Sequence, residues 1–297
     1  MKIRKIIKLL FTLLTLVTLV ACTQNVEEAK KTIRVGSKDF TESLVVAEIY
    51  ALALEDAGFN VERKLNIAGS VVHTSIINDE IDLYPEYTGT GLLAILKMDL
   101  ITDPVEVYET VKEAYNEQFD LTWLDQSQAN DSNGLVIRTA LAEELGIYTI
   151  SDLQKNADKI RVASQGEFEQ REDGIPGLEK VYGKFNFKSV TVYDNGLKYQ
   201  ILENNEADVA PAYTTEGQLT NTELFTLLVD DKFFWPPYFL APVVRNNVLT
   251  ENPEIAAVLN KISAALDTET VTSLNAKIDV EKLEYEDVAE EFYSSIK

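Results

Sequence analysis

The most informative stretch of this chain is residues 78–91, which read NDEIDLYPEYTGTG. A second stretch, residues 204–217, reads NNEADVAPAYTTEG and matches the first at seven of 14 positions, at an offset of 126. The short run IRVGS at residues 33–37 likewise recurs as IRVAS at residues 160–164, at an offset of 127. Two matches at nearly the same offset indicate an internal repeat, and therefore two lobes of similar structure.

Short β-branched runs alternate with helical patterns in both copies of the repeat. We expect strands at residues 32–37, 61–67, 81–84, 160–164, 189–193 and 208–212. We expect helices at residues 42–57, 71–78, 178–182 and 197–204, and throughout residues 252–297. This alternation predicts parallel βαβ units. The expected fold is therefore α/β, with two lobes that are each a mostly parallel sheet flanked by helices, as in a hinged binding protein.

The repeat also suggests where the lobes begin and end. We place lobe I at residues 32–136 plus 241–297, and lobe II at residues 137–240, so that the chain crosses between them near residues 133–138 and 240–245. Each copy of the repeat delivers Tyr-Thr at the carboxyl end of a strand. Because open α/β sheets bind ligands beyond the carboxyl ends of their strands, Tyr87 and Tyr213 should face one another across an interlobe cleft.

The first 21 residues are typical of a signal peptide. Four basic residues precede the largely apolar run at residues 9–21, which is too short to span a bilayer as a permanent helix. The run ends in LVAC with Cys22, which resembles the lipobox of bacterial lipoproteins, where the cysteine receives a diacylglycerol and becomes the new N-terminus. Two acyl chains give stable anchoring, and residues 22–31 would then be the lipidated cysteine and its tether. A chance cysteine after a signal peptide is the alternative.

Composition excludes several other classes of function. The chain has 49 acidic and 27 basic residues and a net charge of −22, so it lacks the clustered cations that nucleic acid binding needs. One cysteine and one histidine, His73, leave no internal disulfide and no multi-thiolate metal site. Residues 89–94 match a dinucleotide fingerprint by letters, but Pro85 precedes them where a buried strand is required. We therefore expect no enzyme, no cofactor, no metal and no later transmembrane segment.

Four ordered motifs resemble those of the solute-binding proteins of ABC importers for glycine betaine, choline and carnitine. They are GSKDFTE at residues 36–42, DLYPEYTGTG at 82–91, FEQREDGIPGL at 168–178 and DDKFFWPPY at 230–238. The resemblance covers essentially the whole mature chain. It implies a type II periplasmic-binding-protein fold, a quaternary ammonium ligand such as glycine betaine, choline, carnitine or proline betaine, and delivery to a separate ABC permease with its ATPase. It also implies a monomer, and the lipid anchor fits members from Gram-positive bacteria.

The resemblance further implies which residues bind the ligand. A quaternary ammonium has no N–H, and aromatic faces hold it by cation–π attraction of about 0.5–2 kcal/mol each. The positions that match the aromatic cage of this family are Tyr87, Tyr213 and Tyr238. The positions that match its carboxylate and polar clamp are Lys38, Thr90, Arg171, Asp131 and Asn133.

Asn133 departs from the family pattern, since relatives usually carry a fourth cage tyrosine there. Either the cage is open on one side, or another aromatic residue fills it, or the ligand makes a polar contact with the amide. Arg171 also has a second interpretation as a surface ion-pair residue, because acidic residues surround it in the sequence. For the whole protein, the alternatives are a ligand sensor or adhesin of the same fold without transport and, third, an extracytoplasmic enzyme.

Overall fold

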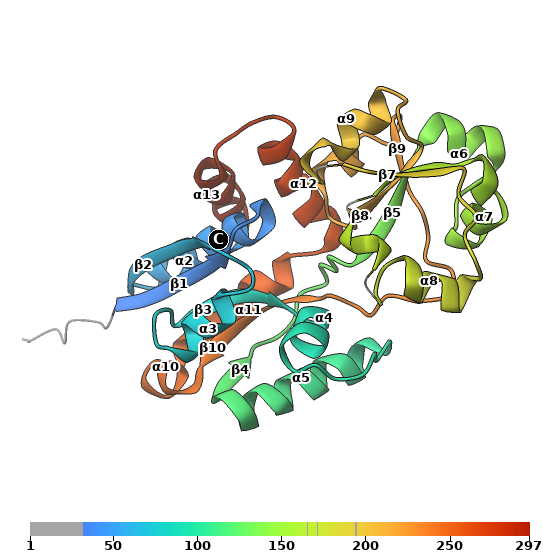
Figure 1. Cartoon of the computed structure of the whole chain (residues 1–297). Coiled ribbons are helices and arrows are strands. Elements are labelled where there is room, and N and C mark those ends of the chain that lie inside the picture. Colours follow the sequence, from blue (N-terminus) through green and yellow to red (C-terminus); the bar gives the residue numbers. More distant parts are fainter. Residues whose placement is uncertain (1–31, 165, 171, 194) are drawn as a thin grey trace, which may run out of the picture. The chain divides into compact units, whose positions relative to one another are not determined.

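Figure 1 shows the computed structural model of the chain, which describes residues 32–297 except residues 165, 171 and 194. The expected signal peptide, Cys22 and the tether lie outside the described residues, and so does Arg171. None of the described helices is long and apolar enough to cross a membrane.

Two five-stranded sheets organise the described residues. The strand order of the first sheet is β2-β1-β3-β10-β4, with bounds Asn60–Ile67, Thr32–Lys38, Leu83–Tyr87, Leu240–Arg245 and Leu121–Trp123. The strand order of the second is β7-β6-β8-β5-β9, with bounds Ser189–Val192, Arg161–Ser164, Val209–Tyr213, Asn133–Arg138 and Phe225–Leu227. The two sheets therefore have the same topology, as the internal repeat predicts. In each, the fourth strand in this order pairs antiparallel with both neighbours.

Helices flank the sheets, as Figure 1 shows. Those that precede the second sheet in the chain are α2 (Thr41–Asp56), α3 (Val72–Ile77), α4 (Thr88–Thr90), a π-helical turn (Gly91–Ile95) and α5 (Pro104–Phe119). Those that follow β5 are α6 (Thr139–Leu145), α7 (Ile150–Lys155), α8 (Ile175–Tyr182) and α9 (Lys198–Glu203). Short 3-10 turns lie at Ala157–Lys159, Glu167–Glu169, Asn195–Leu197 and Gly217–Thr220. The chain ends with α10 (Asn246–Glu251), α11 (Glu254–Ala265), α12 (Thr268–Asp279) and α13 (Tyr285–Ile296).

Alternating side chains of the central strands enter separate cores on the two faces of each sheet. In β3, Leu83 packs in the core formed with α2 and the C-terminal helices, whereas Tyr84 packs in the core formed with α3 and α5. In β5, Leu135 and Val136 divide between two cores in the same way. This is the period of two that a strand imposes on its side chains. Helices α11, α12 and α13 pack in the first core together with α2 and β3.

The repeat reappears as a matched arginine–aspartate contact in the two sheets. In lobe I, the Arg34 backbone N–H and Nε donate to Asp82 Oδ2 at 2.8 and 3.0 Å. In lobe II, the same atoms of Arg161 donate to Asp208 Oδ2, both at 2.9 Å. Both aspartates are almost fully buried. Although burial alone would raise the pKa of Asp208, hydrogen bonds from Arg161 and Arg138 lower it to about 2.

The chain passes from the first sheet to the second between β4 and β5, and returns between β9 and β10. The segments expected to be crossings, residues 133–138 and 240–245, are the strands β5 and β10 themselves. The crossings are residues 124–132 and 228–239, which lie just before them. The lobe boundary expected between residues 136 and 137 accordingly falls inside β5, whereas the boundary between 240 and 241 falls at the start of β10.

Most expected elements are present with shifted ends, and the strand that contains Pro85 is an example. The strand expected at residues 81–84 is β3, Leu83–Tyr87, and it continues through Pro85 to Tyr87 with every side chain buried. Pro85 lies opposite Pro242 of β10, so the argument that Pro85 excludes a buried strand was wrong. A helical turn begins directly at Thr88, and residues 89–94 therefore do not form a glycine-rich loop between strand and helix.

Candidate functional site

A cavity of about 1140 Å³ lies beyond the carboxyl ends of β1, β3 and β8. Lys38 ends β1, Tyr87 ends β3 and Tyr213 ends β8, and all three line it. The cavity also receives side chains from both crossings, including Asp131 and Tyr238. It is therefore built by the ends of both sheets together with the segments that join them.

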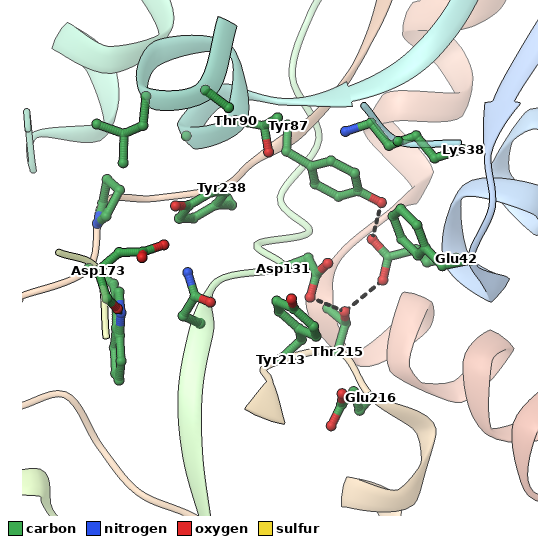
Figure 2. A pocket seen from close by; sticks show the side chains of 18 of the residues that line it. Lys38, Glu42, Tyr87, Thr90, Asp131, Asp173, Tyr213, Thr215, Glu216 and Tyr238 are labelled. Atoms are coloured by element: carbon green, nitrogen blue, oxygen red, sulfur yellow. Dashed lines mark hydrogen bonds between the residues drawn. The ribbon is translucent and has the colours of Figure 1, made fainter. Parts of the chain in front are cut away.

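The cavity brings together every predicted ligand-binding residue that the structure describes. These residues are Lys38, Tyr87, Thr90, Asp131, Asn133, Tyr213 and Tyr238. Figure 2 shows the rings of Tyr87, Tyr213 and Tyr238 bordering one space, with Thr90 above it and Asp131 and Thr215 on the lower side. Their shared location agrees with the sequence-based grouping, while their individual contacts to a ligand stay predictions.

Tyr87 is held in place by Glu42. Its hydroxyl donates to Glu42 Oε1 at 2.8 Å, and its side chain is 3% exposed. Burial, together with the negative charge of Glu42, raises the pKa of Tyr87 well above its ordinary value. The residue is thus a neutral hydrogen-bond donor at any physiological pH, and its ring orientation is set by the carboxylate.

Lys38 already has a buried partner. Its ammonium group forms an ion pair with Glu86 and lies 4.9 Å from the centroid of the Tyr87 ring. Glu86 also accepts a hydrogen bond of 3.1 Å from the Tyr84 hydroxyl. Lys38 therefore borders the cavity as half of a neutral pair, rather than as an unpaired cation that awaits a carboxylate.

Gly89 and the first crossing fix the position of Tyr238. A methyl group on Gly89 would lie 2.7 Å from the Tyr238 ring, so only glycine permits this approach. The backbone N–H of Tyr238 donates to Asn130 Oδ1 at 2.7 Å, and its carbonyl accepts from the Asp131 N–H at 3.1 Å. The second crossing is consequently fastened to the first at the edge of the cavity.

A shared hydroxyl joins two carboxyl groups at the floor of the cavity. The Thr215 hydroxyl lies 2.6 Å from Glu42 Oε2 and 2.6 Å from Asp131 Oδ1, as the dashed lines of Figure 2 show. Asn275 of α12 donates to Glu42 Oε2 at 3.0 Å and to the Thr215 carbonyl at 2.8 Å. Burial, followed by the neighbouring carboxyl, raises the pKa of Asp131 well above its usual range. Burial likewise raises the pKa of Glu42.

Further aromatic residues line the cavity besides the three tyrosines. They are Phe40, Phe234 and Trp235. Trp235 is nearly buried, and its indole N–H donates to the Asp173 carbonyl at 2.8 Å. Asn133 lies at the start of β5, opposite Tyr213. The three alternatives for Asn133 stay predictions.

The described part of the chain contains no group of three or more histidine, cysteine, aspartate or glutamate residues that could hold a metal ion. The described lining residues carry seven carboxyl groups and one amine. Acidic and aromatic side chains thus both line the cavity.

Residues 31–295 match the model of a known family, the substrate-binding domain of ABC-type glycine betaine transport systems. The chain belongs to this family. The predicted resemblance and the predicted type II binding-protein fold are both confirmed. The relatives described below are binding components of transport systems, in keeping with the expectation that the chain is not an enzyme.

The relatives of this chain are named for different compounds. The carnitine transport binding protein OpuCC of Listeria monocytogenes is 32% identical over 268 residues, which are 89% of this chain and 86% of the relative. The ergothioneine transport permease/ergothioneine binding protein EgtU of Helicobacter pylori is 32% identical over 265 residues, or 89% of this chain and 47% of that protein. Among solved structures, a glycine betaine/carnitine/choline ABC transporter protein has a TM-score of 0.81 and 28% identity. The structural match covers 90% of this chain and 98% of the solved chain.

Sequence reasoning missed the carboxyl network of this family member. Glu42 lies inside the motif at residues 36–42, but nothing in that motif pointed to its contact with Tyr87. Thr215 occupies the repeat position that corresponds to Gly89, and this difference between the copies was the available signal. Asn275 comes from α12, far away in the sequence, and no local pattern could have placed it beside Thr215.

Proposed function

We propose that this chain captures a quaternary ammonium compound in a cage formed by Tyr87, Tyr213 and Tyr238. The observation that carries the proposal is that these three tyrosines, from three separate segments, border one cavity. A trimethylammonium group presents methyl hydrogens and a diffuse charge, so aromatic faces can bind it without the desolvation penalty of a buried carboxylate contact. The acidic lining adds a favourable potential for a cationic head group.

The other end of the ligand would meet polar groups. Thr90 and Asn133 line the cavity, and with Arg171 they are the groups that we propose for a ligand carboxylate or hydroxyl. An arginine suits a carboxylate because its guanidinium donates two parallel hydrogen bonds. Asp131, which also lines the cavity, is proposed as a further polar contact. Lys38, which is paired with Glu86, would act through its place beside the Tyr87 ring.

We further propose that the protein works outside the cytoplasm as the capturing subunit of an ABC importer. Ligand that bridges the two lobes would stabilise a closed state through its higher affinity for that state. The closed monomer would then dock on a separate permease with its ATPase. Lipidation of Cys22 would hold the chain on the outer face of the cell membrane, as in a Gram-positive bacterium.

Calorimetric titration of the full chain in detergent micelles tests the ligand class. Glycine betaine, choline, carnitine, proline betaine and ergothioneine are compared with glycine, which lacks the methyl groups. We expect saturable heat with a dissociation constant on the order of micromolar for at least one trimethylammonium or related quaternary compound. Glycine should give none. Tyr87→Ala and Tyr213→Ala should each weaken binding by roughly tenfold or more, since each removes an aromatic wall.

Tyr148→Ala is the matched control, because Tyr148 is an exposed tyrosine that does not line the cavity. The affinity of Tyr148→Ala for the ligand should equal that of the unmodified chain. Binding of glycine but of no quaternary compound would contradict the proposed ligand class. Loss of cellular uptake on deletion of the chain supports transport, whereas binding with unchanged uptake favours the sensor or adhesin alternative.

The lipid anchor has its own test. Cells that express the chain are labelled with a radioactive fatty acid, and the label on the protein is measured after membrane isolation. We expect label on the unmodified chain and none on Cys22→Ala, which should also leave the membrane fraction. Labelling of Cys22→Ala at the level of the unmodified chain would contradict the anchor.

A further inference from the structure

Thr215 makes two contacts with carboxyl oxygens that one hydroxyl proton cannot supply. Its Oγ1 lies 2.6 Å from Glu42 Oε2 and 2.6 Å from Asp131 Oδ1. A threonine hydroxyl has one proton to donate, and an ionised carboxylate can only accept. Both distances are those of strong O–H···O hydrogen bonds. One of the two contacts must therefore use a proton that belongs to a carboxyl group.

The remaining contacts show which carboxyl group carries that proton. Glu42 accepts from three donors: Tyr87 at 2.8 Å, Asn275 at 3.0 Å and Thr215. An acceptor with three donors is best ionised. Within the described residues, the Asp131 side chain hydrogen-bonds to Thr215 alone. Asp131 is therefore the group that gains from being a donor.

Nearby charges agree with this assignment. Among the described residues, Lys38 of β1 is the cation that lowers the pKa of both carboxyl groups, and it is already bound to Glu86 of β3. Glu216, which follows Thr215, adds a further negative charge near Asp131 and is itself paired with Lys198 of α9. Asp279 of α12 accepts from Thr41 beside Glu42. With several carboxylates and one paired lysine around it, a second full negative charge at Asp131 is unfavourable.

We infer that Asp131 is protonated and donates to Thr215, which donates in turn to the Glu42 carboxylate, so that this chain of hydrogen bonds positions Tyr87 for the ligand. The inference rests on the proposed function only in naming what Tyr87 contacts. It makes Thr215 and Glu42 positioning residues, and it gives Asp131 an effect on Tyr87 through them, besides the polar contact proposed above. It also links Thr215, which follows β8, to Glu42 and Asn275 of α2 and α12.

Loss of the Asp131 proton would break this chain. The Thr215 hydroxyl could then serve one carboxylate only, and two negative charges would face each other across it. Because the raised pKa favours the protonated acid, the arrangement is complete at low pH and is lost as the pH rises through the pKa of Asp131. Ligand affinity should fall in the same direction. A single proton limits the fall to tenfold per pH unit.

The test is calorimetric titration of the full chain with glycine betaine from pH 5.5 to 9. Glycine betaine keeps a constant net charge above pH ~5, because its carboxyl group is ionised and its ammonium cannot titrate. We expect the affinity of the unmodified chain to fall at least fivefold over this range. In Asp131→Asn, the amide N–H replaces the carboxyl O–H as donor to Thr215 and cannot titrate. Its affinity should be constant with pH and should exceed that of the unmodified chain at pH 9.

Asp158→Asn is the matched control, since Asp158 is exposed and lies outside the cavity. It should keep the pH profile of the unmodified chain. An affinity of the unmodified chain that rises with pH overturns the inference, and so does an Asp131→Asn variant that binds more weakly at every pH, which would mean that an ionised Asp131 is needed. Thr215→Val should also flatten the profile, at a lower affinity, because it removes the bridging hydroxyl.

A second measurement does not depend on any ligand. The ¹³C carboxyl shift of Asp131, assigned by its absence in Asp131→Asn, reports protonation in the ligand-free chain. We expect the shift of a protonated acid at pH 6, whereas an ionised shift at that pH overturns the inference. If no quaternary compound binds at any pH, the proposed function fails, while the carboxyl shift still decides the inference about the proton.

Discussion

The two lobes share a scaffold and differ where they border the cavity. Arg34 and Arg161 each hold an aspartate of the repeat with the same atoms. Thr88 and Thr214, which follow the tyrosines of the repeat, both use their backbone and hydroxyl groups to bind the crossing next to their own sheet. Positions that are identical in the two copies thus maintain the same structural contacts twice.

The copies also differ in the contacts that they make at the cavity. In lobe I, Gly89 leaves space for the Tyr238 ring. In lobe II, its counterpart Thr215 contacts the carboxyl groups of Glu42 and Asp131. Tyr87 is 3% exposed, but Tyr213 is 40% exposed. The comparison teaches that one tyrosine is fixed in a wall and the other is accessible from the cavity.

The largest effect is expected for the shared arginine–aspartate contact. Asp82→Ala and Asp208→Ala each leave an arginine without its buried partner, and we expect a loss of about 3–5 kcal/mol in the free energy of unfolding. Urea denaturation of both variants measures it. Similar losses in the two lobes would support equivalent scaffolds, whereas a loss below about 1 kcal/mol in one variant would break the equivalence.

Much of this scaffold was predictable because it is encoded locally. The repeat, the parallel strands and the C-terminal helices follow from periodicity in continuous stretches. Strands β5 and β10 were not predicted, since each pairs antiparallel with a strand that is distant in the sequence. Pro85 and Pro242 lie opposite one another in buried strands, where proline is unfavourable because it lacks an N–H. Tertiary packing overrides the local signal there.

Gly89→Ala should disturb the site more than the scaffold. The added methyl group would meet the Tyr238 ring at 2.7 Å, so the ring must move out of its place in the cavity. We expect a loss of about 1–3 kcal/mol in unfolding free energy, together with a fall in affinity for the best quaternary ammonium ligand. Calorimetry measures the affinity. Gly146→Ala is the control, since Gly146 has open space around its Cα but a positive φ of 65°; it should lower stability without altering affinity.

Acid should weaken lobe II through Asp208. Its pKa is lowered to about 2 in the folded chain, against about 3.9 in an unfolded chain. A lowered pKa stabilises the fold above the unfolded value, and this contribution disappears as the pH falls from about 4 to about 2. We expect the contribution to be about 1–2 kcal/mol after solvent screening. Unfolding free energies of the unmodified chain and Asp208→Asn should therefore converge as the pH approaches 2, and parallel curves would refute this.

The smallest effect is expected for the hydroxyl of Thr215. Thr215→Ala removes the bridge between Glu42 and Asp131, and we expect a loss of about 1 kcal/mol in unfolding free energy. Thr215→Ser retains the hydroxyl and should retain most of that stability. Thermal unfolding of both variants provides the comparison. Equal stability of the two variants would show that the bridge contributes nothing to the fold.

The site was only partly predictable from the sequence. Tyr87 and Tyr213 followed from the repeat, and Tyr238 from the resemblance, because these residues lie in recognisable motifs. Asn275 and Thr215 meet through the packing of α12 against residues 217–220, where Gly217 lies against the backbone of Ala276. Such a contact joins segments about 60 residues apart and leaves no periodic signal. Lys38 lines the cavity, and its predicted contact with a ligand stays a prediction, but its ion pair with Glu86 was not predicted.

The two crossings run side by side as a short antiparallel ribbon. Asn130 pairs with Phe239, the Leu240 N–H donates to the Ala129 carbonyl at 3.0 Å, and Asp131 bonds to Tyr238. Thr88 and Thr214 fasten this ribbon to the two sheets. Because hydrogen bonds join the two crossings, they cannot slide past one another as two unpaired segments could. Any movement of one sheet against the other must therefore displace both crossings together.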